Sequence, residues 1–261
     1  MDLLDPIAGF AVGVLIGLTG VGGGSLMTPL LVLAFGVAPQ LAIGTDLLFA
    51  CVTKAFGAWV HGSRGSIDWL VIRRLTLGSV PSAVITLTWI AYFPPDRGLR
   101  AVLMPALAVA LAVTSVAMLL QPKLHALGMR LRTRAPERFK GAQPALTVLA
   151  GAILGFLVTL TSVGAGALGV VMLVYLYPYR LTPAKLVGTD IAHAIPLTLV
   201  AGLGHLTLGH VDLKLLGLLL TGSIPGIILG SRLTTVVKPA LVRGAIALML
   251  IVVAARIVLT S

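Results

Sequence analysis

Apolar residues fill most of the chain in long runs, and short polar or proline-containing stretches separate one run from the next. A run of about 20 apolar residues is long enough to cross a bilayer core as an α-helix. The pattern therefore predicts an all-α, polytopic membrane protein with about eight transmembrane helices. The expected crossings are residues 7–35, 41–60, 69–93, 99–120, 145–177, 185–205, 213–232 and 240–258.

Glycines interrupt two of these runs, 7–35 and 145–177, and both runs are longer than one crossing requires. The interruptions are Gly20-Val-Gly-Gly-Gly-Ser25 and Ser162-Val-Gly-Ala-Gly166. Each glycine weakens a helix interior by roughly 1 kcal/mol relative to alanine, so both helices are predicted to break there. The unpaired N–H groups and the dipole at the start of each second half-helix would favour an anion. Two matched breaks are a typical position for a transporter binding site.

The second half of the chain repeats the first at many positions. Gly44-Thr45-Asp46 recurs as Gly188-Thr189-Asp190, Gly78-Ser79-Val80-Pro81 recurs as Gly222-Ser223-Ile224-Pro225, His61 matches His205, and Asp68 matches Asp212. Such a repeat predicts two homologous four-helix halves, the first helix of each being broken at its glycine-rich stretch. The predicted units are a first membrane repeat (1–120), a basic cytoplasmic loop (121–144) and a second membrane repeat (145–261).

The charge distribution sets the expected orientation. Only 10% of the residues are charged, and the segment 121–144 alone carries +5 of the net charge of +11. This concentration is typical of a cytoplasmic loop that follows the positive-inside rule, and it can also bind anionic lipid headgroups; nucleic acid is not an expected partner. The segment carries Lys123, Arg130, Arg132, Arg134, Arg138 and Lys140 against the single Glu137.

The relative direction of the two halves stays open. Four crossings per half would make the repeats parallel, and Arg180, Lys185, Arg232 and Lys238 would then face outward, against the positive-inside rule. If each broken segment is instead a hairpin, the repeats become inverted. The side of the membrane that holds the N-terminus therefore stays open as well.

Three ionisable residues lie inside apolar runs: Asp46, Lys54 and Asp190. An ionisable residue near the bilayer centre costs at least about 2.5 kcal/mol, so it usually faces the bundle interior and serves a function. His193 follows Asp190 by one helical turn. We predict that Asp46, Asp190 and His193 act in gating or proton coupling. Because both aspartates lie close to helix starts, a solvated position or a role in complementing the helix dipole also stays open.

The two halves differ in their cationic or titratable groups. Lys54 has Thr198 as its repeat counterpart, and His193 has Phe49. A lysine and a histidine near two clusters of backbone N–H groups would suit a small anion. The predicted substrate-binding residues are Thr19, Gly22, Gly23, Gly24, Ser25, Thr45, Lys54, Thr161, Gly164, Ala165, Gly166 and Thr189.

The sequence favours no enzyme, metal site or cofactor. Cys51 is the single cysteine, so neither a disulfide framework nor a metal cluster is predicted. The stretch from Gly20 to Ser25 lacks the Gly-Lys-Ser/Thr continuation and the preceding strand of a phosphate-binding loop. Two intramembrane aspartates could act as an acid–base pair, but no further motif supports that interpretation.

In combination, the motifs resemble the TauE/SafE sulfite exporter family. They are Gly20-Val-Gly-Gly-Gly24, Gly44-Thr45-Asp46, His61-Gly-Ser-Arg-Gly65-Ser-Ile-Asp68-Trp69, Val187-Gly-Thr-Asp190, Gly204-His205 and Val211-Asp212. The resemblance implies a multi-pass transporter of the inner (plasma) membrane that moves sulfite, sulfate or an organosulfonate such as sulfoacetate. It places binding at Gly22, Gly23, Gly24, Thr45 and Asp46 and at their second-half matches.

Electrostatics favours export as the direction of transport. Moving one negative charge outward through an inside-negative potential releases about 2.3 kcal/mol per 100 mV, so efflux of such an anion needs no coupled ion. The alternative is a proton-coupled importer of a sulfur oxyanion or small organic anion, with Asp46, Asp190 and His193 as proton carriers. Whether the chain forms a homodimer stays open.

Overall fold

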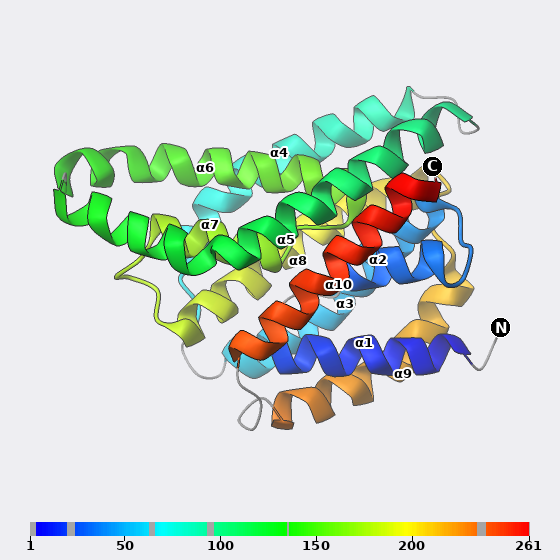
Figure 1. Ribbon diagram of the computed structural model, residues 1–261. Coiled ribbons are helices and arrows are strands. Elements are labelled where there is room, and N and C mark those ends of the chain that lie inside the picture. The colour runs from blue at the N-terminus through cyan, green and yellow to red at the C-terminus, as the bar shows by residue number, and fades with distance from the viewer. Residues whose placement is uncertain are drawn as a thin grey trace.

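The computed structural model describes residues 4–19, 24–62, 66–92, 97–134, 136–233 and 239–260. All regular secondary structure in these residues is helical (Figure 1). The helices are α1 (Leu4–Thr19), α2 (Gly24–Leu33), α3 (Pro39–Gly62), α4 (Trp69–Ala91), α5 (Arg97–Arg134), α6 (Pro136–Thr161), α7 (Ala167–Leu176), α8 (Pro183–Thr207), α9 (Leu213–Leu233) and α10 (Pro239–Thr260).

Six helices in the described residues are long and apolar enough to span a membrane. They are α3, α4, α5, α6, α8 and α9, and three shorter apolar helical segments accompany them: Pro6–Ile16, Ala167–Leu176 and Gly244–Leu259. The all-α, polytopic prediction is therefore confirmed. The number of eight crossings stays a prediction, because the expected crossing 145–177 contains two helices, α6 and α7, and the expected crossing 7–35 contains α1 and α2.

Helices α6 and α7 form an antiparallel hairpin. The side-chain amide of Gln143, near the start of α6, donates to the carbonyl of Leu176 at the end of α7. The hydroxyls of Thr147 and Tyr177 lie 2.8 Å apart in the same region. Between the helices, Gly164 and Gly166 have φ of 115° and 124°, a conformation that favours glycine and lets the chain reverse. The expected single crossing 145–177 is thus a chain reversal.

The N-terminal helix and α6 run in opposite directions. In Figure 1, α1 starts at the N-terminus on the right and runs left, whereas α6 starts at the left, where it follows α5, and runs right. Both chain ends lie on the right. Residues 20–23 between α1 and α2 lie outside the described residues, so no path is given for them.

Contacts between helices far apart in sequence hold the bundle together. The most extensive pairs are α1 with α9, α4 with α6, α3 with α8, and α5 with α10. Glycines bring two of these pairs to backbone contact: a Cβ at Gly78 would lie 1.9 Å from the Val148 carbonyl oxygen, and one at Gly222 would lie 1.8 Å from that of Pro6. The two repeated Gly-Ser-Val/Ile-Pro motifs therefore mark close helix packing.

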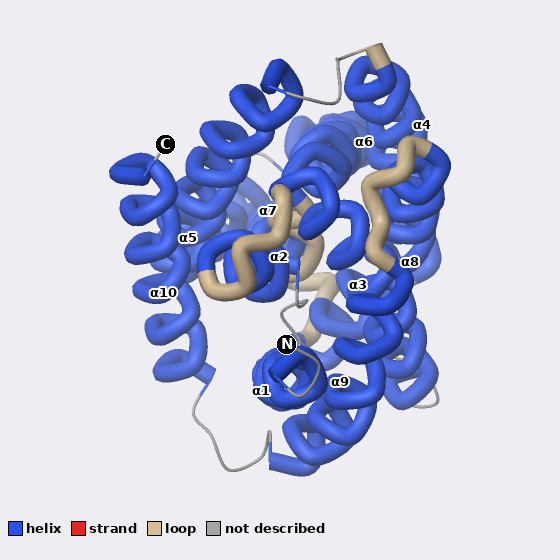
Figure 2. The backbone as a smooth tube through the Cα atoms, turned by 90° about the vertical axis from the view of Figure 1, so that its right-hand side faces the viewer, coloured by secondary structure: helices blue, strands red, loops and turns tan. Residues whose placement is uncertain are grey.

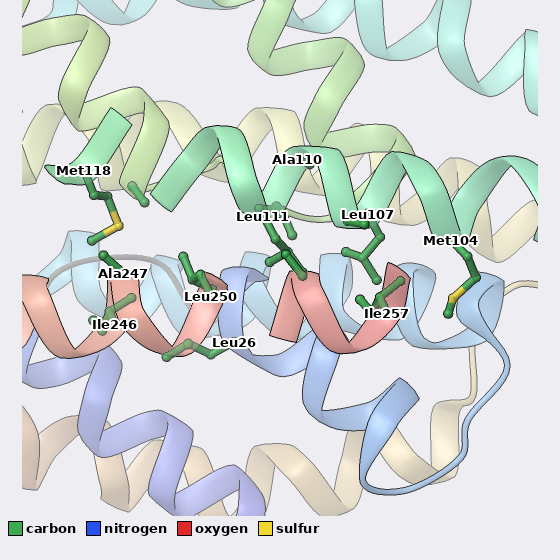
Figure 3. Packing of buried hydrophobic residues seen from close by; sticks show 14 residues of the cluster. Leu26, Met104, Leu107, Ala110, Leu111, Met118, Ile246, Ala247, Leu250 and Ile257 are labelled. Atoms are coloured by element: carbon green, nitrogen blue, oxygen red, sulfur yellow. The ribbon is translucent and has the colours of Figure 1, made fainter. Parts of the chain in front are cut away.

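The short helices α2 and α7 lie in the middle of the bundle, surrounded by longer helices (Figure 2). Leu26 of α2 and Ala167 of α7 share one buried cluster with Leu111 of α5 and Leu250 of α10. Figure 3 shows this packing around α5 and α10. The cluster brings the first turns of both short helices together in the interior.

The basic segment 121–144 differs from the expected loop, because it is helical on both sides of residue 135. Helix α5 continues through Pro122 to Arg134, and α6 begins at Pro136. A helix of 38 residues is about 57 Å long, well beyond the roughly 30 Å of a bilayer core. Most residues after Pro122 are good helix formers, so the helix persists past the proline. The basic ends form the extension at the left of Figure 1.

Candidate functional site

The Asp46 side chain connects α3 to the first turns of α2 through hydrogen bonds. Its Oδ2 accepts hydrogen bonds from the backbone N–H of Thr28 at 3.1 Å and from the Thr28 hydroxyl at 2.5 Å. Both side chains are fully buried. A carboxylate at a helix start complements the positive end of the helix dipole. The Asp46 carboxylate therefore lies beside the first turns of α2, next to the stretch where the sequence predicted an anionic ligand.

Asp190 takes the corresponding place beside α7. Its Oδ1 packs on the backbone of Gly169, where a Cβ would lie only 2.2 Å from that oxygen. Its Oδ2 is buried and has no hydrogen-bond partner among the described residues. Each aspartate thus faces the first turns of the short helix in its own half of the sequence.

Lys54 extends from α3 to the linker between α6 and α7. Its Nζ donates to the Ala165 carbonyl at 2.8 Å, and its side chain is almost fully buried. Among the described residues Lys54 forms no direct ion pair with Asp46 or Asp190, although both carboxyl groups are close enough to act on it electrostatically. Its ammonium group has three donors, so further hydrogen bonds are available to a ligand.

His193 and Ser79 bring α8 and α4 to the same region. The His193 Nε2 lies 3.0 Å from the Ser79 hydroxyl, and both side chains are buried. Lys54 acts on His193 electrostatically. Ser162, in the linker after α6, is also buried and lies within interaction range of Asp46; its hydroxyl has no hydrogen-bond partner among the described residues. We call Asp46, Lys54, Ser79, Ser162, Asp190 and His193 the central cluster.

The charges of the central cluster do not balance by themselves. Two carboxyl groups face one ammonium group, and an unpaired buried charge is costly. If both carboxyl groups are ionised, the cluster carries one surplus negative charge. An entering anion would add another unless a carboxyl group takes up a proton. Anion binding and protonation are therefore physically linked at this site.

Thr45 and Thr189 each accept a hydrogen bond from a loop in the other half of the sequence. The Thr45 hydroxyl accepts the backbone N–H of Asp212 at 3.0 Å, and the Thr189 hydroxyl accepts that of Asp68 at 2.9 Å. Asp212 and Asp68 in turn accept N–H groups at the starts of α9 and α4. These two predicted binding residues thus use their hydroxyl oxygens in a reciprocal contact between the halves.

The remaining predicted binding residues lie at the two glycine-rich stretches. Thr161 ends α6 and hydrogen-bonds within its own turn, and Gly164, Ala165 and Gly166 form the reversal that receives Lys54. For the first stretch, Gly22 and Gly23 lie outside the described residues. Thr19, Gly24 and Ser25 are described as backbone only, at the end of α1 and the start of α2.

Three members of this environment were absent from the predicted site. Ser79 belongs to the repeated Gly-Ser-Val-Pro motif, and Ser162 belongs to the second glycine-rich stretch, so both carried a pattern that could have drawn attention to them. Thr28 carried none. Its repeat counterpart is Val170, and only the folded chain places its hydroxyl at Asp46.

A two-point ion pair joins the two halves at the basic end. Arg180 donates from Nε to Asp68 Oδ2 at 2.6 Å and from Nη2 to Oδ1 at 3.0 Å. Partial burial alone would raise the pKa of Asp68, but the hydrogen bonds from Arg180 and from the Val71 N–H outweigh it and hold this pKa below its usual value. The contact links the loop before α4 to the loop after α7.

We expect Arg180→Gln to lower the melting temperature at neutral pH by a few degrees at most, because the guanidinium is half-exposed. A lowered carboxyl pKa stabilises the fold above about pH 4 and loses that effect as pH falls through the lowered value. The melting temperatures of the wild type and the variant should therefore become equal in acid. Melting curves from neutral to acidic pH, with the exposed Lys185→Gln as control, test this; equal melting temperatures at neutral pH would contradict it.

A cavity of about 620 Å³ opens near this ion pair. Its lining includes His125 of the α5 extension, Tyr177 at the end of α7, and Leu186 of α8. The Arg74 Nη1 donates to the Tyr177 hydroxyl at 3.2 Å, and the Arg180 guanidinium lies over the Tyr177 ring at 6.0 Å. Arginines beside a cavity attract anions to it.

Comparison with known proteins identifies the family of this chain. The profile of the family described as "Sulfite exporter TauE/SafE" matches residues 6–257, nearly the whole chain. The chain belongs to the TauE/SafE family. Its members are membrane transporters and not enzymes, and the family implies a small anion as substrate.

The curated relatives agree with this assignment. "Probable membrane transporter protein YjnA" of Bacillus subtilis (strain 168) is 36% identical over 244 residues, which cover 92% of either chain. "Probable membrane transporter protein YdhB" of the same organism is 25% identical over 243 residues, 91% of this chain and 92% of the relative. No solved structure matches this TauE/SafE chain. The chain is therefore a multi-pass membrane protein of a transporter family.

Proposed function

We propose that this protein transports sulfite or a related small sulfur-containing anion, such as an organosulfonate, across the plasma membrane. The observation that carries the proposal is the position of Lys54, a buried cation held at the reversal between α6 and α7. Its remaining donors suit an oxyanion, and charge-assisted hydrogen bonds of this kind are roughly twice as strong as neutral ones. In this proposal the anion binds between Lys54 and the first turns of the two short helices.

We further propose that the chain consists of two inverted halves, each beginning with a helical hairpin. The sequence repeat supports this arrangement, as do the opposite directions of α1 and α6 and the reciprocal contacts of Thr45 and Thr189. Inverted repeats with interrupted helices at a midplane site are a common transporter design.

An inverted arrangement also resolves the distribution of positive charge. His125 of the basic extension lies 3.3 Å from the Pro178 carbonyl, so Arg180 and Lys185 occupy the same end of the bundle as the extension. The positive-inside rule then assigns this end to the cytoplasm. Both chain termini, at the other end in Figure 1, would face outward.

Export is the direction that we propose, because an inside-negative potential drives an anion outward by about 2.3 kcal/mol per charge and 100 mV. Proton-coupled import is a second candidate, and one observation favours it. The central cluster holds two buried carboxyl groups against one ammonium group, and an oxygen of each carboxyl group has no hydrogen-bond partner among the described residues.

Reconstituted protein distinguishes these two functions. We expect proteoliposomes to carry sulfite or sulfoacetate at a rate that follows an imposed membrane potential, with protein-free vesicles as control. Proton-coupled import would instead be driven by an inward proton gradient and would carry the anion inward even against an inside-negative potential. Absence of flux for sulfite, sulfate and organosulfonates under every gradient would overturn the proposed function.

A further inference from the structure

Asp46 and Asp190 occupy equivalent positions of the repeat, but their surroundings differ. Each faces the first turns of a short helix, α2 or α7. At the position where α2 has Thr28, the repeat places Val170 on α7. Valine has no side-chain donor, so the hydroxyl that serves Asp46 has no counterpart at Asp190. The difference makes the two carboxyl groups chemically distinct.

The surroundings of Asp46 hold it as a carboxylate. Its Oδ2 receives two hydrogen bonds from Thr28, one from the backbone and one from the hydroxyl. Hydrogen bonds donated to a carboxylate favour the ionised form. The Ser162 hydroxyl lies within interaction range and can add a further donor. Protonating Asp46 would weaken these contacts and loosen α2 from α3.

Among the described residues, the Asp190 carboxyl group is held by charge alone. Lys54 on α3 is the charged group that acts on it, and its Oδ2 has no hydrogen-bond partner among the described residues. Asp46 also acts electrostatically on Lys54. On α8 itself His193 follows one turn later, with its Nε2 at Ser79 of α4. The contact of Asp190 on α7 is the backbone of Gly169, which carries no titratable group.

An anion that binds Lys54 therefore competes with Asp190 for the same ammonium group. Once the anion is paired with Lys54, no described residue would offer the Asp190 carboxylate a hydrogen-bond donor or an available counter-charge in the bundle interior. Such a buried charge is neutralised most simply by taking up a proton. Asp46 can stay ionised in both states, because Thr28 donates to it throughout.

We propose that Asp190 takes up one proton when an anion binds to Lys54, while Asp46 remains an ionised anchor of α2. The proton comes from the aqueous phase that the site faces: an O–H bond forms on the carboxyl group when the anion binds, and it breaks again as the proton returns to water when the anion leaves. The proposal rests on the proposed function, because it requires that an anion binds in the central cluster. For an anion of charge −2, such as sulfoacetate, the complex with one proton still moves one negative charge, so export still follows the membrane potential.

Binding at different pH values tests the proposal. The probes are sulfate and isethionate, whose own protonation does not change between about pH 6 and pH 8, and affinity is measured by equilibrium binding to the purified full-length protein. Uptake of one proton per anion makes affinity fall by about tenfold for each unit of rising pH. Asp190→Asn should bind the anion with an affinity independent of pH.

The repeat supplies a matched control and a second variant. Asp46→Asn makes the same chemical change at the equivalent position. It should lower the melting temperature, and the protein that remains folded should bind the anion with the wild-type pH dependence of affinity. Val170→Thr places a hydroxyl on α7 where α2 has Thr28. The added donor should favour the Asp190 carboxylate and move the pH dependence to lower pH, so the test does not depend on the Asp190→Asn protein folding.

The outcomes separate this inference from the proposed function. Wild-type protein that binds no anion at any pH would overturn the proposed function and the inference together. Binding that is independent of pH in the wild type, or that keeps its pH dependence in Asp190→Asn, would overturn the inference alone. Loss of the pH dependence in Asp46→Asn but not in Asp190→Asn would show that the roles are reversed and would also overturn it.

Discussion

Replacing Lys54 by methionine should reduce anion flux in proteoliposomes by about 100-fold or more. Removing one charged hydrogen-bonding group from a buried site costs about 1.5–3 kcal/mol, and the two carboxyl groups that remain would repel the anion further. Methionine keeps a similar length and apolar stem, so the helix packing around α3 should persist. Initial rates of sulfite or sulfoacetate efflux, normalised to the amount of folded protein, measure the effect.

Two further variants make this result specific to Lys54. Lys140→Met removes the same charge from the exposed basic extension and should leave flux close to wild type. Lys54→Arg keeps the charge and should retain more activity than Lys54→Met. Flux in Lys54→Met within a few-fold of wild type would mean that the anion does not bind at the central cluster.

Gly78→Ala should lower the melting temperature of the detergent-solubilised protein by roughly 5–10 °C, given an overpacking cost of about 1–3 kcal/mol. The new Cβ would lie 1.9 Å from the Val148 carbonyl oxygen and 2.7 Å from the Ala152 nitrogen. Both are backbone atoms, so no side-chain rotation relieves the clash. Helix α4 must therefore separate from α6, which also moves Ser79 away from His193.

Gly141→Ala is the matched control for this variant. Gly141 also lies in a helix, α6, but no atom lies within 4 Å of a Cβ built there. Alanine is the better helix former by about 1 kcal/mol, so the control should be neutral or slightly stabilising. An equal fall of the melting temperature in both variants would show that the loss of glycine itself destabilises the protein, and not the clash between α4 and α6.

The sequence predicted the helices and the place of the chain reversal because both depend on local properties. Apolar runs define the helices α3, α4, α8 and α9 to within a few residues, and the stretch 162–166 lies between α6 and α7. The extension of α5 through Pro122 was not predictable by the same rules. A proline is usually a helix end, and here the helix continues past it.

The site was predictable only in part, because its geometry depends on contacts between distant residues. The intramembrane positions of Asp46, Lys54 and Asp190 pointed to them as candidates. Nothing local indicates that Lys54 reaches Ala165, or that Thr45 and Thr189 hold loops of the opposite half. A hydroxyl that looks suited to a ligand in the sequence can be satisfied by backbone that lies more than 100 residues away along the chain.

These reciprocal contacts have a consequence for how the protein is made. The Asp68 amide bonds to Thr189, which is synthesised 121 residues later, and α1 packs against α9, which is later still. At a translation rate of about 5–20 residues per second, the helices that pack against the first half are synthesised on the order of ten seconds after it has left the ribosome. During that interval its helices are in the membrane without their native neighbours. The final bundle therefore assembles only near the end of translation. A chain that is truncated early lacks the helices against which its first half packs.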